Sequence, residues 1–243
     1  HSTTSTANSG LLAQILPVFE AQTGIEAHVV AVGTGQALKN AANGDGDILL
    51  VHSKAAEESF VARGWGVERL DVMYNDFVLV GPAQDPAMIR GHRDVSIALE
   101  KIMTQEALFI SRGDDSGTHM AELRLWSATG VAPSTFSGKW YREIGSGMGA
   151  TLNMAASIDA YTLADRATWL SFGNKGNLVV LVEGDPRLFN QYGVIAINPK
   201  RHAHINKEGA EAFVEWITGP RGQAEIAAFQ VNSQQLFFPN ATN

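Results

Sequence analysis

The spacing of apolar residues changes several times along the first third of the chain. Apolar residues recur every three or four positions between Leu11 and Phe19, which predicts a helix capped by Ser9 and ended by Gly24. The fully apolar run Ile48–Val51 instead predicts a buried parallel strand. Because helix-like and strand-like segments alternate here, we expect a parallel sheet covered by helices.

The same alternation resumes after a long extended segment that ends at Gly81-Pro82. The expected strands are residues 25–32, 48–51, 72–80, 108–110, 178–182 and 192–198. The expected helices are residues 36–43, 54–62, 95–103, 116–129 and 147–156, followed by two helices within 208–229 that Gly219-Pro220 separates.

Two α/β units with one long strand leading out and another leading back indicate two lobes joined by two crossover strands. We expect lobe I to hold residues 1–78 and 195–243, and lobe II to hold residues 79–194. The polar patch Met73–Phe77 lies at the first crossover and suits a hinge. The last helices are expected to pack back on lobe I.

Composition narrows the classes of function. The 243 residues, 45% of them hydrophobic, are enough to build two lobes with a sizeable core. Apolar runs are strand-sized and fall short of the ~20 residues needed to cross a bilayer, so no membrane insertion is expected. The net charge of −7, with Lys and Arg dispersed, argues against nucleic acid as a partner.

The chain contains no cysteine, which removes disulfides and thiolate metal sites from consideration. This composition fits an extracytoplasmic protein. The chain begins in a polar segment, His1-Ser2-Thr3-Thr4, in which no signal peptide is visible. We therefore expect that an upstream segment has been removed.

Four turns that precede expected helices are rich in glycine or hydroxyl residues. In α/β sheets such turns lie at the carboxyl ends of strands, and the first N–H groups of a helix attract anions. Two turns belong to each expected lobe, so donors from both lobes could surround one small anion. Each turn also fits an ordinary helix cap. The turns are residues 3–6, 33–35, 112–118 and 145–149.

The turn after the strand at 108–110 is the most informative of the four. Arg112 supplies a permanent cation with several donors, and Ser116 and Thr118 supply hydroxyl groups. This combination favours a grip on an oxyanion. An alternative is that Arg112 forms a structural ion pair with the aspartates beside it.

Enzyme and metal sites are less well supported. Ser116 and His119 lie with two aspartates in a single turn, whereas the members of a hydrolase triad converge from separate elements. The seven histidines are dispersed, and no spacing is typical of a metal site. We therefore expect neither an enzyme nor a bound metal or cofactor.

In a second polar string, 159–168, Arg166 either pairs with Asp165 or reaches a cleft.

Taken together, these strings resemble the tungstate-binding proteins of ABC-type uptake systems. The matching segments span most of the chain in the family's order: residues 3–6 with 9–12, 33–38, 47–53, 72–82, 111–119, 147–152 and 161–168. The resemblance implies a type II periplasmic-binding-protein fold, in which two α/β lobes hold one WO₄²⁻ in the cleft between them.

The resemblance also implies which residues bind the anion. Those residues offer hydroxyl groups, backbone N–H groups or, in one case, a guanidinium group. They are Thr3, Thr4, Ser5, Thr34, Arg112, Ser116, Gly117, Thr118, Met148 and Gly149.

The chain departs from the family pattern in two places. His1-Ser2 stands where the first strand should precede the threonine turn, and we expect that this strand is cut from the sequence rather than truly absent from the protein. Ala164 and Ala167 stand where relatives are expected to carry Thr and Gly, and neither change is expected to end binding.

Two alternatives stay open on the ligand. Phosphate keeps a proton near neutral pH and needs an acceptor carboxylate, whereas tungstate is fully deprotonated and needs donors only. Phosphate is therefore favoured if Asp114 points into the cleft, and tungstate if Asp114 faces away and caps a helix. Molybdate has the same charge and shape as tungstate.

The implied role is a periplasmic or extracytoplasmic solute-binding protein that delivers its anion to the membrane permease of an ABC transporter. A monomer is expected. The alternative from another class is an anion-sensing domain that reports to a regulator, although the sequence shows no output domain.

Overall fold

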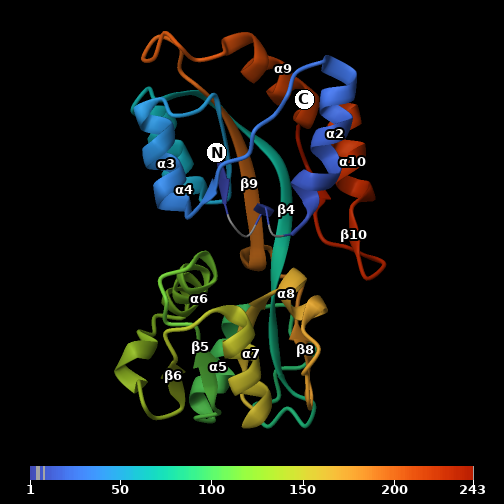
Figure 1. Cartoon of the computed structure of the whole chain (residues 1–243). Coiled ribbons are helices and arrows are strands. Elements are labelled where there is room, and N and C mark those ends of the chain that lie inside the picture. Colours follow the sequence, from blue (N-terminus) through green and yellow to red (C-terminus); the bar gives the residue numbers. More distant parts are fainter. Residues whose placement is uncertain (4–5, 8, 243) are drawn as a thin grey trace. The chain divides into compact units, whose positions relative to one another are not determined.

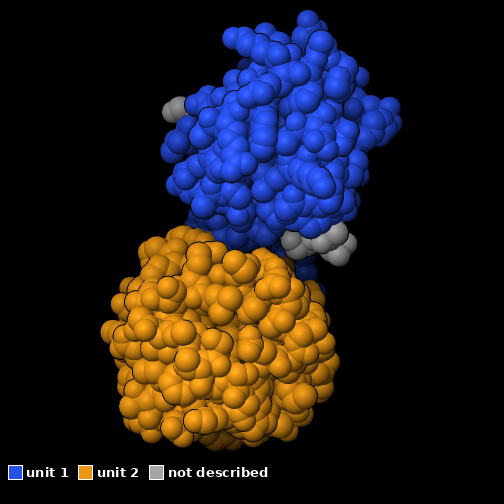
Figure 2. Space-filling view, turned by 90° about the vertical axis from the view of Figure 1, so that its left-hand side faces the viewer, with its two compact units in different colours: residues 1–75, 190–243 blue, residues 76–189 orange. Residues whose placement is uncertain are grey.

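The structure, a computed structural model, describes residues 1–3, 6–7 and 9–242. They divide into two compact units, shown in Figure 2: unit 1 contains residues 1–75 and 190–243, and unit 2 contains residues 76–189. The boundaries fall inside β4 (Gly66–Pro82) and at the start of β9 (Phe189–Ile197), so these two strands supply residues to both units. The sequence placed the boundaries a few residues later, at 78/79 and 194/195.

Unit 1 is built around the longer part of a mixed sheet, in which the strands follow the order β12-β4-β9-β3-β1-β2. β1 lies between β2 and β3 and runs parallel to both, while β9 runs antiparallel to β3. Besides β4 and β9, the elements of unit 1 (Figure 1) are β1 Ser2–Thr3, α2 Leu11–Thr23, β2 Ala31–Val32, α3 Thr34–Asn43, β3 Ile48–Val51, α4 Lys54–Ala62, α9 Lys207–Thr218, α10 Pro220–Ala228, β10 Gln230–Val231, β11 Gln234–Gln235 and β12 Phe238–Pro239.

The structure refines two strands of unit 1. A short strand does precede the threonine turn, because Ser2 and Thr3 pair with Ala31 and Val32 on one side and Ser2 pairs with Leu50 on the other. The strand expected over 25–32 is confined to Ala31–Val32. β2 is short because a strand persists only where a neighbouring strand completes its hydrogen bonds, and its neighbour β1 is only two residues long.

The N-cap of helix α2 lies one residue later than expected. Gly10 occupies the N-cap position with a positive φ of 87°, which favours glycine. Ser9 still contributes, because its hydroxyl accepts from the Leu11 N–H at 3.3 Å and donates to the Thr6 carbonyl at 2.7 Å. Gly24 ends the helix as expected, in the left-handed conformation.

The last two helices pack beside α2 within unit 1 (Figure 1). Phe19 of α2 meets Phe213 and Trp216 of α9 edge-on, with ring centroids 5.2 and 5.5 Å apart. The indole N–H of Trp216 donates to Gln22 at 2.7 Å. Residues near the two ends of the chain therefore share one core, and the split at Gly219-Pro220 is confirmed.

Unit 2 contains a parallel pair of strands, β5 and β6, and two strands, β7 and β8, that run antiparallel to the last part of β4. Its elements (Figure 1) are α5 Val95–Thr104, β5 Phe109–Ser111, α6 Gly117–Ala128, the 3₁₀ turn Pro133–Phe136, β6 Tyr141–Glu143, α7 Met148–Ser157, β7 Thr162–Asp165, α8 Arg166–Ser171, β8 Leu178–Val182 and the 3₁₀ turn Pro186–Leu188.

Aromatic packing forms part of the core of unit 2. Phe109 stacks on Tyr141 with ring centroids 5.8 Å apart and meets Trp126 edge-on at 5.4 Å. All three side chains are fully buried. Because Phe109 lies on β5, Tyr141 on β6 and Trp126 on α6, this contact fixes α6 against the parallel strand pair.

Arg166 forms an ion pair within unit 2, with a partner that the sequence did not indicate. Its Nε and Nη2 donate to the carboxylate of Asp76 at 2.7 and 2.5 Å, and Nη2 also donates to Glu183 at 2.7 Å. The expected partner, Asp165, instead accepts from the Thr168 N–H at 2.8 Å and caps α8. The residue thus has a structural role.

Over the described residues, none of the helices combines the length and the apolar character that a bilayer span requires.

Candidate functional site

In unit 1, the candidate residues follow the carboxyl ends of three adjacent strands. The register pairs Thr3 with Val32 and Ser2 with Leu50, so β1, β2 and β3 end at the same edge. Thr3 closes β1, Thr34 begins α3 two residues after β2, and His52 follows β3 directly. Sequence reasoning predicted the first two and missed His52, although a polar residue directly after a buried parallel strand was a usable signal.

The Thr3 hydroxyl is buried and engaged within its own turn. Its oxygen lies 2.7 Å from the Thr6 hydroxyl and accepts from the Thr6 N–H at 3.3 Å. Nε2 of His52 lies 3.2 Å from the same oxygen. Thr3 is only 3% exposed, so its hydroxyl lies below the surface at this edge of the sheet. The predicted residues Thr4 and Ser5 lie outside the described residues.

His52 connects this turn to the two strands that cross between the units. Its Nδ1 lies 3.2 Å from the Asn190 amide oxygen, and the Asn190 amide nitrogen donates to Asn75 at 2.8 Å. Asn75 in turn donates to the Tyr192 hydroxyl at 3.4 Å. The Tyr192 ring packs against the imidazole with centroids 4.8 Å apart. Asn75 and Asn190 are the boundary residues of unit 1.

Thr34 lies in a more open environment at the start of α3. The preceding residue, Gly33, has extended backbone angles, so the first N–H groups of the helix remain without intrahelical acceptors. Thr34 itself is half-buried. The start of α3 can therefore offer a hydroxyl and several backbone donors to an anion.

In unit 2, the two predicted turns lie side by side. β5 and β6 are parallel and in register at Ser111 and Glu143, so both end at one edge. The Ser146 N–H donates to the Arg112 carbonyl at 3.1 Å, which ties the turn before α7 to the turn before α6. Gly113 is required here, because its φ is 59° and an added Cβ would lie 2.8 Å from Cβ of Glu143. Two helix N-termini therefore start next to each other.

Arg112 and Asp114 form an ion pair within the turn. Nε and Nη2 of Arg112 donate to Oδ2 of Asp114 at 3.2 and 2.6 Å, and Oδ1 of Asp114 accepts from the Ser116 N–H at 3.2 Å. Burial alone would raise the pKa of Asp114, but the hydrogen bonds from Ser116 and Arg112 outweigh burial and hold that pKa below its usual range. Asp114 is thus an ionised acceptor already occupied by donors of its own turn.

The pairing leaves part of the guanidinium available. A guanidinium carries five N–H donors in a planar fork, and Asp114 occupies only its Nε and Nη2 side. Within the described part of the chain, Nη1 of Arg112 donates to no acceptor. Asp114 therefore fixes the orientation of the guanidinium group and leaves some of its N–H donors available.

The remaining candidates of unit 2 begin the two helices. Ser116 is the N-cap of α6, and its hydroxyl accepts from the His119 N–H at 3.3 Å. Gly117 is the first residue of α6, and the following Thr118 is largely buried. Met148 is the first residue of α7 and is buried, whereas Gly149 is exposed. The structure thus brings the unit 2 candidates to one edge.

The same contacts weigh against the hydrolase alternative. The Ser116 hydroxyl faces the backbone N–H of His119, and Nδ1 of the His119 ring accepts from the Asp115 N–H at 3.0 Å. A general base must instead accept the proton of the serine hydroxyl. His119 is buried and accepts a hydrogen bond within its own turn, as a capping residue does.

A buried carboxyl group lies directly beneath this edge. Tyr141 donates to Glu122 at 2.7 Å, and Glu122 is 2% exposed. Burial raises the pKa of Glu122 to about 7, although the donors of Tyr141, Ser111 and Trp126 oppose the shift. Sequence reasoning missed Glu122, since a glutamate on an amphipathic helix is usually solvated.

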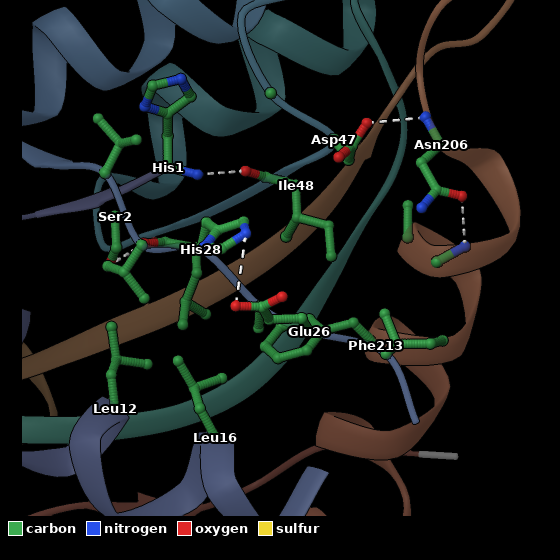
Figure 3. Close-up of a pocket in the computed structure, with 18 of the residues that line it drawn as sticks. His1, Ser2, Leu12, Leu16, Glu26, His28, Asp47, Ile48, Asn206 and Phe213 are labelled. Atoms are coloured by element: carbon green, nitrogen blue, oxygen red, sulfur yellow. Dashed lines mark hydrogen bonds and ion pairs between the residues drawn. The ribbon is translucent and has the colours of Figure 1, made fainter. Parts of the chain in front are cut away.

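A separate cavity of about 320 Å³ lies in unit 1 (Figure 3), and the residues that line it include none of the candidate anion-binding residues that the structure describes. Leu12 and Leu16 of α2 and Phe213 of α9 line its apolar side, and Glu26 and Asp47 add carboxylates. Carboxylates repel an anion, so this cavity is unsuited to one. Among the described residues, no group of three or more His, Asp or Glu side chains is arranged to hold a metal ion.

The known proteins that are similar to this chain match it over most of its length. A family model described as a PBP superfamily domain matches residues 1–221. The chain is 54% identical to the tungstate-binding protein TupA of Peptoclostridium acidaminophilum, over 99% of this chain and 84% of that protein. It is 39% identical to the TupA of Campylobacter jejuni, over 98% and 88% of the two chains.

Solved structures give the same result. The chain is similar to the tungstate-binding protein TupA of Desulfovibrio alaskensis, with a TM-score of 0.94 and 46% identity over 99% of this chain and 97% of that one. It is also similar to the structure of the tungstate ABC transporter from Geobacter sulfurreducens, with a TM-score of 0.79 and 48% identity over 94% and 96%.

Proposed function

The chain belongs to the PBP superfamily and, within it, to the tungstate-binding proteins of ABC transporters, and from this premise we propose that it captures tungstate and passes it to a membrane permease. The donors that we assign to WO₄²⁻ lie at the strand-end edge of each unit. Thr34, Arg112 and the starts of α3, α6 and α7 supply those donors.

The state of Asp114 is the observation that best supports tungstate over phosphate. Both oxygens of Asp114 accept from donors of the same turn, and its pKa is held low. A protonated oxyanion needs an acceptor for its proton, and three of the roughly four acceptor positions of this carboxylate already take hydrogen bonds from its own turn. A fully deprotonated dianion needs donors only, and the two edges supply hydroxyl groups, backbone N–H groups and a guanidinium.

The number of donors is sufficient for tight binding. A hydrogen bond to a charged partner contributes about 1.5–3 kcal/mol. About seven such bonds support a Kd near 1 nM, which corresponds to ~12 kcal/mol, after the cost of association is subtracted. The net charge of −7 opposes the approach of a dianion, so the helix N-termini and Arg112 must create a local positive potential.

The proposed role extends to location and partners. The chain acts outside the cytoplasm, as a binding protein rather than an enzyme, and works as a monomer that docks on its permease once loaded. Its relatives in the comparisons are binding proteins of transport systems, which supports this role.

Competitive titration calorimetry tests the proposal. Tungstate is expected to bind at one site per chain in the nanomolar range, and molybdate to compete because its charge and shape are the same. Phosphate and sulfate are expected to bind far more weakly. Tight phosphate binding that tungstate does not displace would overturn the proposal.

A further inference from the structure

The cavity in unit 1 begins where β1 begins (Figure 3). His1 and Ser2 line one end of it, and the amino group of His1 donates to the Ile48 carbonyl at 2.6 Å. Residues 25–30 and residues 45–48 also line the cavity. These two segments lead into β2 and β3, the strands that flank β1. The cavity therefore lies between two segments that continue the neighbours of β1.

We propose that this cavity accepts a further stretch of β1. The occupant is an extended, apolar segment that is joined to the N-terminal side of His1 and lies between residues 26–29 and residues 45–48. It binds by adding a strand to exposed backbone edges, a mode in which main-chain hydrogen bonds supply the affinity. The proposal does not depend on which anion the protein binds.

The register of β1 specifies where such a segment pairs. Ser2 aligns with Ala31 on β2 and with Leu50 on β3, and all three strands are parallel. Counting back, the position before His1 aligns with residues 29 and 48, and each earlier position moves back by one on both sides. A segment of about four residues, at ~3.3 Å per residue, therefore reaches residues 26 and 45. Every residue in these two ranges lines the cavity.

Backbone groups that face this position are available for pairing. The Val30 carbonyl accepts from the Ser2 N–H at 3.0 Å, so it faces β1. In an extended strand the N–H of the same residue points the same way, and so does the N–H of His28, two positions back. Within the described residues, neither of these N–H groups donates to an acceptor. The Ala27 N–H, on the opposite edge, donates to Glu20 at 2.9 Å.

The surroundings of this position suit an apolar occupant. Leu12 and Leu16 of α2 and Phe213 of α9 line the cavity on one face of the sheet. On the other face, Ala37 of α3 belongs to one buried cluster with Leu49 of β3. A parallel strand that is covered by helices on both faces is apolar at successive positions. The expected occupant is therefore a run of apolar residues.

The proposal also accounts for the behaviour of residues 25–32. Their pattern predicts a strand over the whole range, but only Ala31–Val32 form one. Val29 and Val30 are 43% and 46% exposed, although valine favours a buried strand. An edge with open donors and exposed valines is a surface that an added strand covers. With the segment in place, β2 is expected to extend back toward residue 26.

Hydrogen exchange on two extended forms of the chain tests the proposal. One form carries Leu-Val-Ile-Val directly before His1, and the control carries Ser-Gly-Ser-Gly, each preceded by lysines for solubility. Exchange of the His28 and Val30 N–H groups is expected to slow at least ~10-fold in the apolar form only, because both then bond to the added strand. The urea midpoint is expected to rise in the same form. If the apolar form aggregates, the free peptide added in excess to the unaltered chain must slow the same two groups.

Paired proline substitutions in the apolar form locate the added strand. Val30→Pro removes an N–H group that faces the cavity and keeps the carbonyl that accepts from Ser2. Val29→Pro removes the neighbouring N–H group, which points to the open edge of the sheet, where proline is tolerated. Val30→Pro is expected to remove most of the rise in urea midpoint, and Val29→Pro to keep it. If Val30→Pro fails to fold, exchange in the form without proline decides.

The outcomes are distinct. Slowed exchange at His28 and Val30 that requires the apolar residues supports the proposal. Unchanged exchange in a folded apolar form overturns it, and so do equal effects of the apolar and Ser-Gly extensions. Exchange that slows as the concentration of the unextended chain rises would assign this edge to a second copy, which also overturns the proposal. None of these measurements uses an anion, so their failure is separate from a failure of tungstate binding.

Discussion

The candidate edges of the two units are built in different ways. In unit 2, the contacts that shape the turn join residues close in sequence: Arg112 with Asp114, Asp114 with Ser116, and Ser116 with His119. In unit 1, the Thr3 hydroxyl contacts Thr6 in its own turn but also His52, and His52 in turn contacts Asn190, 138 positions further along.

This difference separates two means of placing a donor. A turn whose partners are two to four residues apart is specified by its own segment, and the helix it begins stabilises it. A hydroxyl whose partners come from distant strands is placed only when the sheet has formed. We therefore expect unit 2 to supply most of the binding energy through Arg112. We expect the contribution of unit 1 to depend on contacts with distant strands.

Replacing Arg112 should give the largest effect. Arg112→Ala removes a cation and a fork of donors and leaves Asp114 as an unpaired negative charge, so tungstate affinity is expected to fall about a thousandfold, or roughly 4 kcal/mol. Calorimetry measures the change. Arg124→Ala, at an exposed position of α6, the helix that follows this turn, is the control and should bind normally. Unchanged affinity in Arg112→Ala would remove this residue from the site.

Replacing Glu122 tests whether the segment of unit 2 that carries the turn at 112–118 also depends on contacts with residues distant in the sequence. Its pKa is raised to about 7 in the folded protein, so between about pH 4.5 and 7 the folded state binds more protons than the unfolded state. Stability is therefore lost as pH rises through this window, by an amount on the order of 2–3 kcal/mol.

Glu122→Gln keeps an oxygen for Tyr141 but cannot ionise, so its stability is expected to vary less across the same window. Denaturant unfolding at a series of pH values measures both profiles. A parallel dependence on pH in the two proteins would contradict the assignment.

Asn190 tests the non-local side of the comparison. Asn190→Ala removes the amide group that contacts Nδ1 of His52 and the Asn75 oxygen, which should cost about 1–3 kcal/mol of stability. Asn153→Ala is the matched control, because Asn153 also bonds to an asparagine, Asn174, but at an exposed site. Equal losses in the two variants in urea unfolding would show that the His52 contacts have no special weight.

Ser116 should give the smallest effect. Ser116→Ala removes the N-cap of α6, which is expected to cost about 1 kcal/mol of stability. Ser157→Ala, at an exposed hydroxyl near the end of α7, should cost less. A change in urea midpoint that is equal in both variants would show that the cap of α6 contributes little.

Much of the architecture could be predicted from the chain itself. Lys54–Ala62 and Leu178–Val182 form elements with the predicted bounds, because their apolar spacing and flanking residues agree. The turn at 112–118 was predicted as a donor site because its residue types carry the chemistry. The expected strand at 25–32 failed because an extended segment pairs only where another strand lies beside it.

The residues that sequence reasoning missed share one property, which is that their partners are distant. Nothing near His52 in the sequence indicates Thr3 or Asn190, and nothing near Glu122 indicates Tyr141. Arg166 was assigned the wrong partner for the same reason, since Asp76 is 90 positions away. A titratable side chain takes its role from what surrounds it in three dimensions.

The sequence by itself determined the alternation of strands and helices, the donor chemistry of the turns and the resemblance to a family, because spacing and residue type act over a few positions. Only the tertiary structure decided that Glu122 is buried and that His52 lies between Thr3 and Asn190. Burial and hydrogen-bond partners depend on which distant segments pack together, and that packing sets the charge and proton of each group.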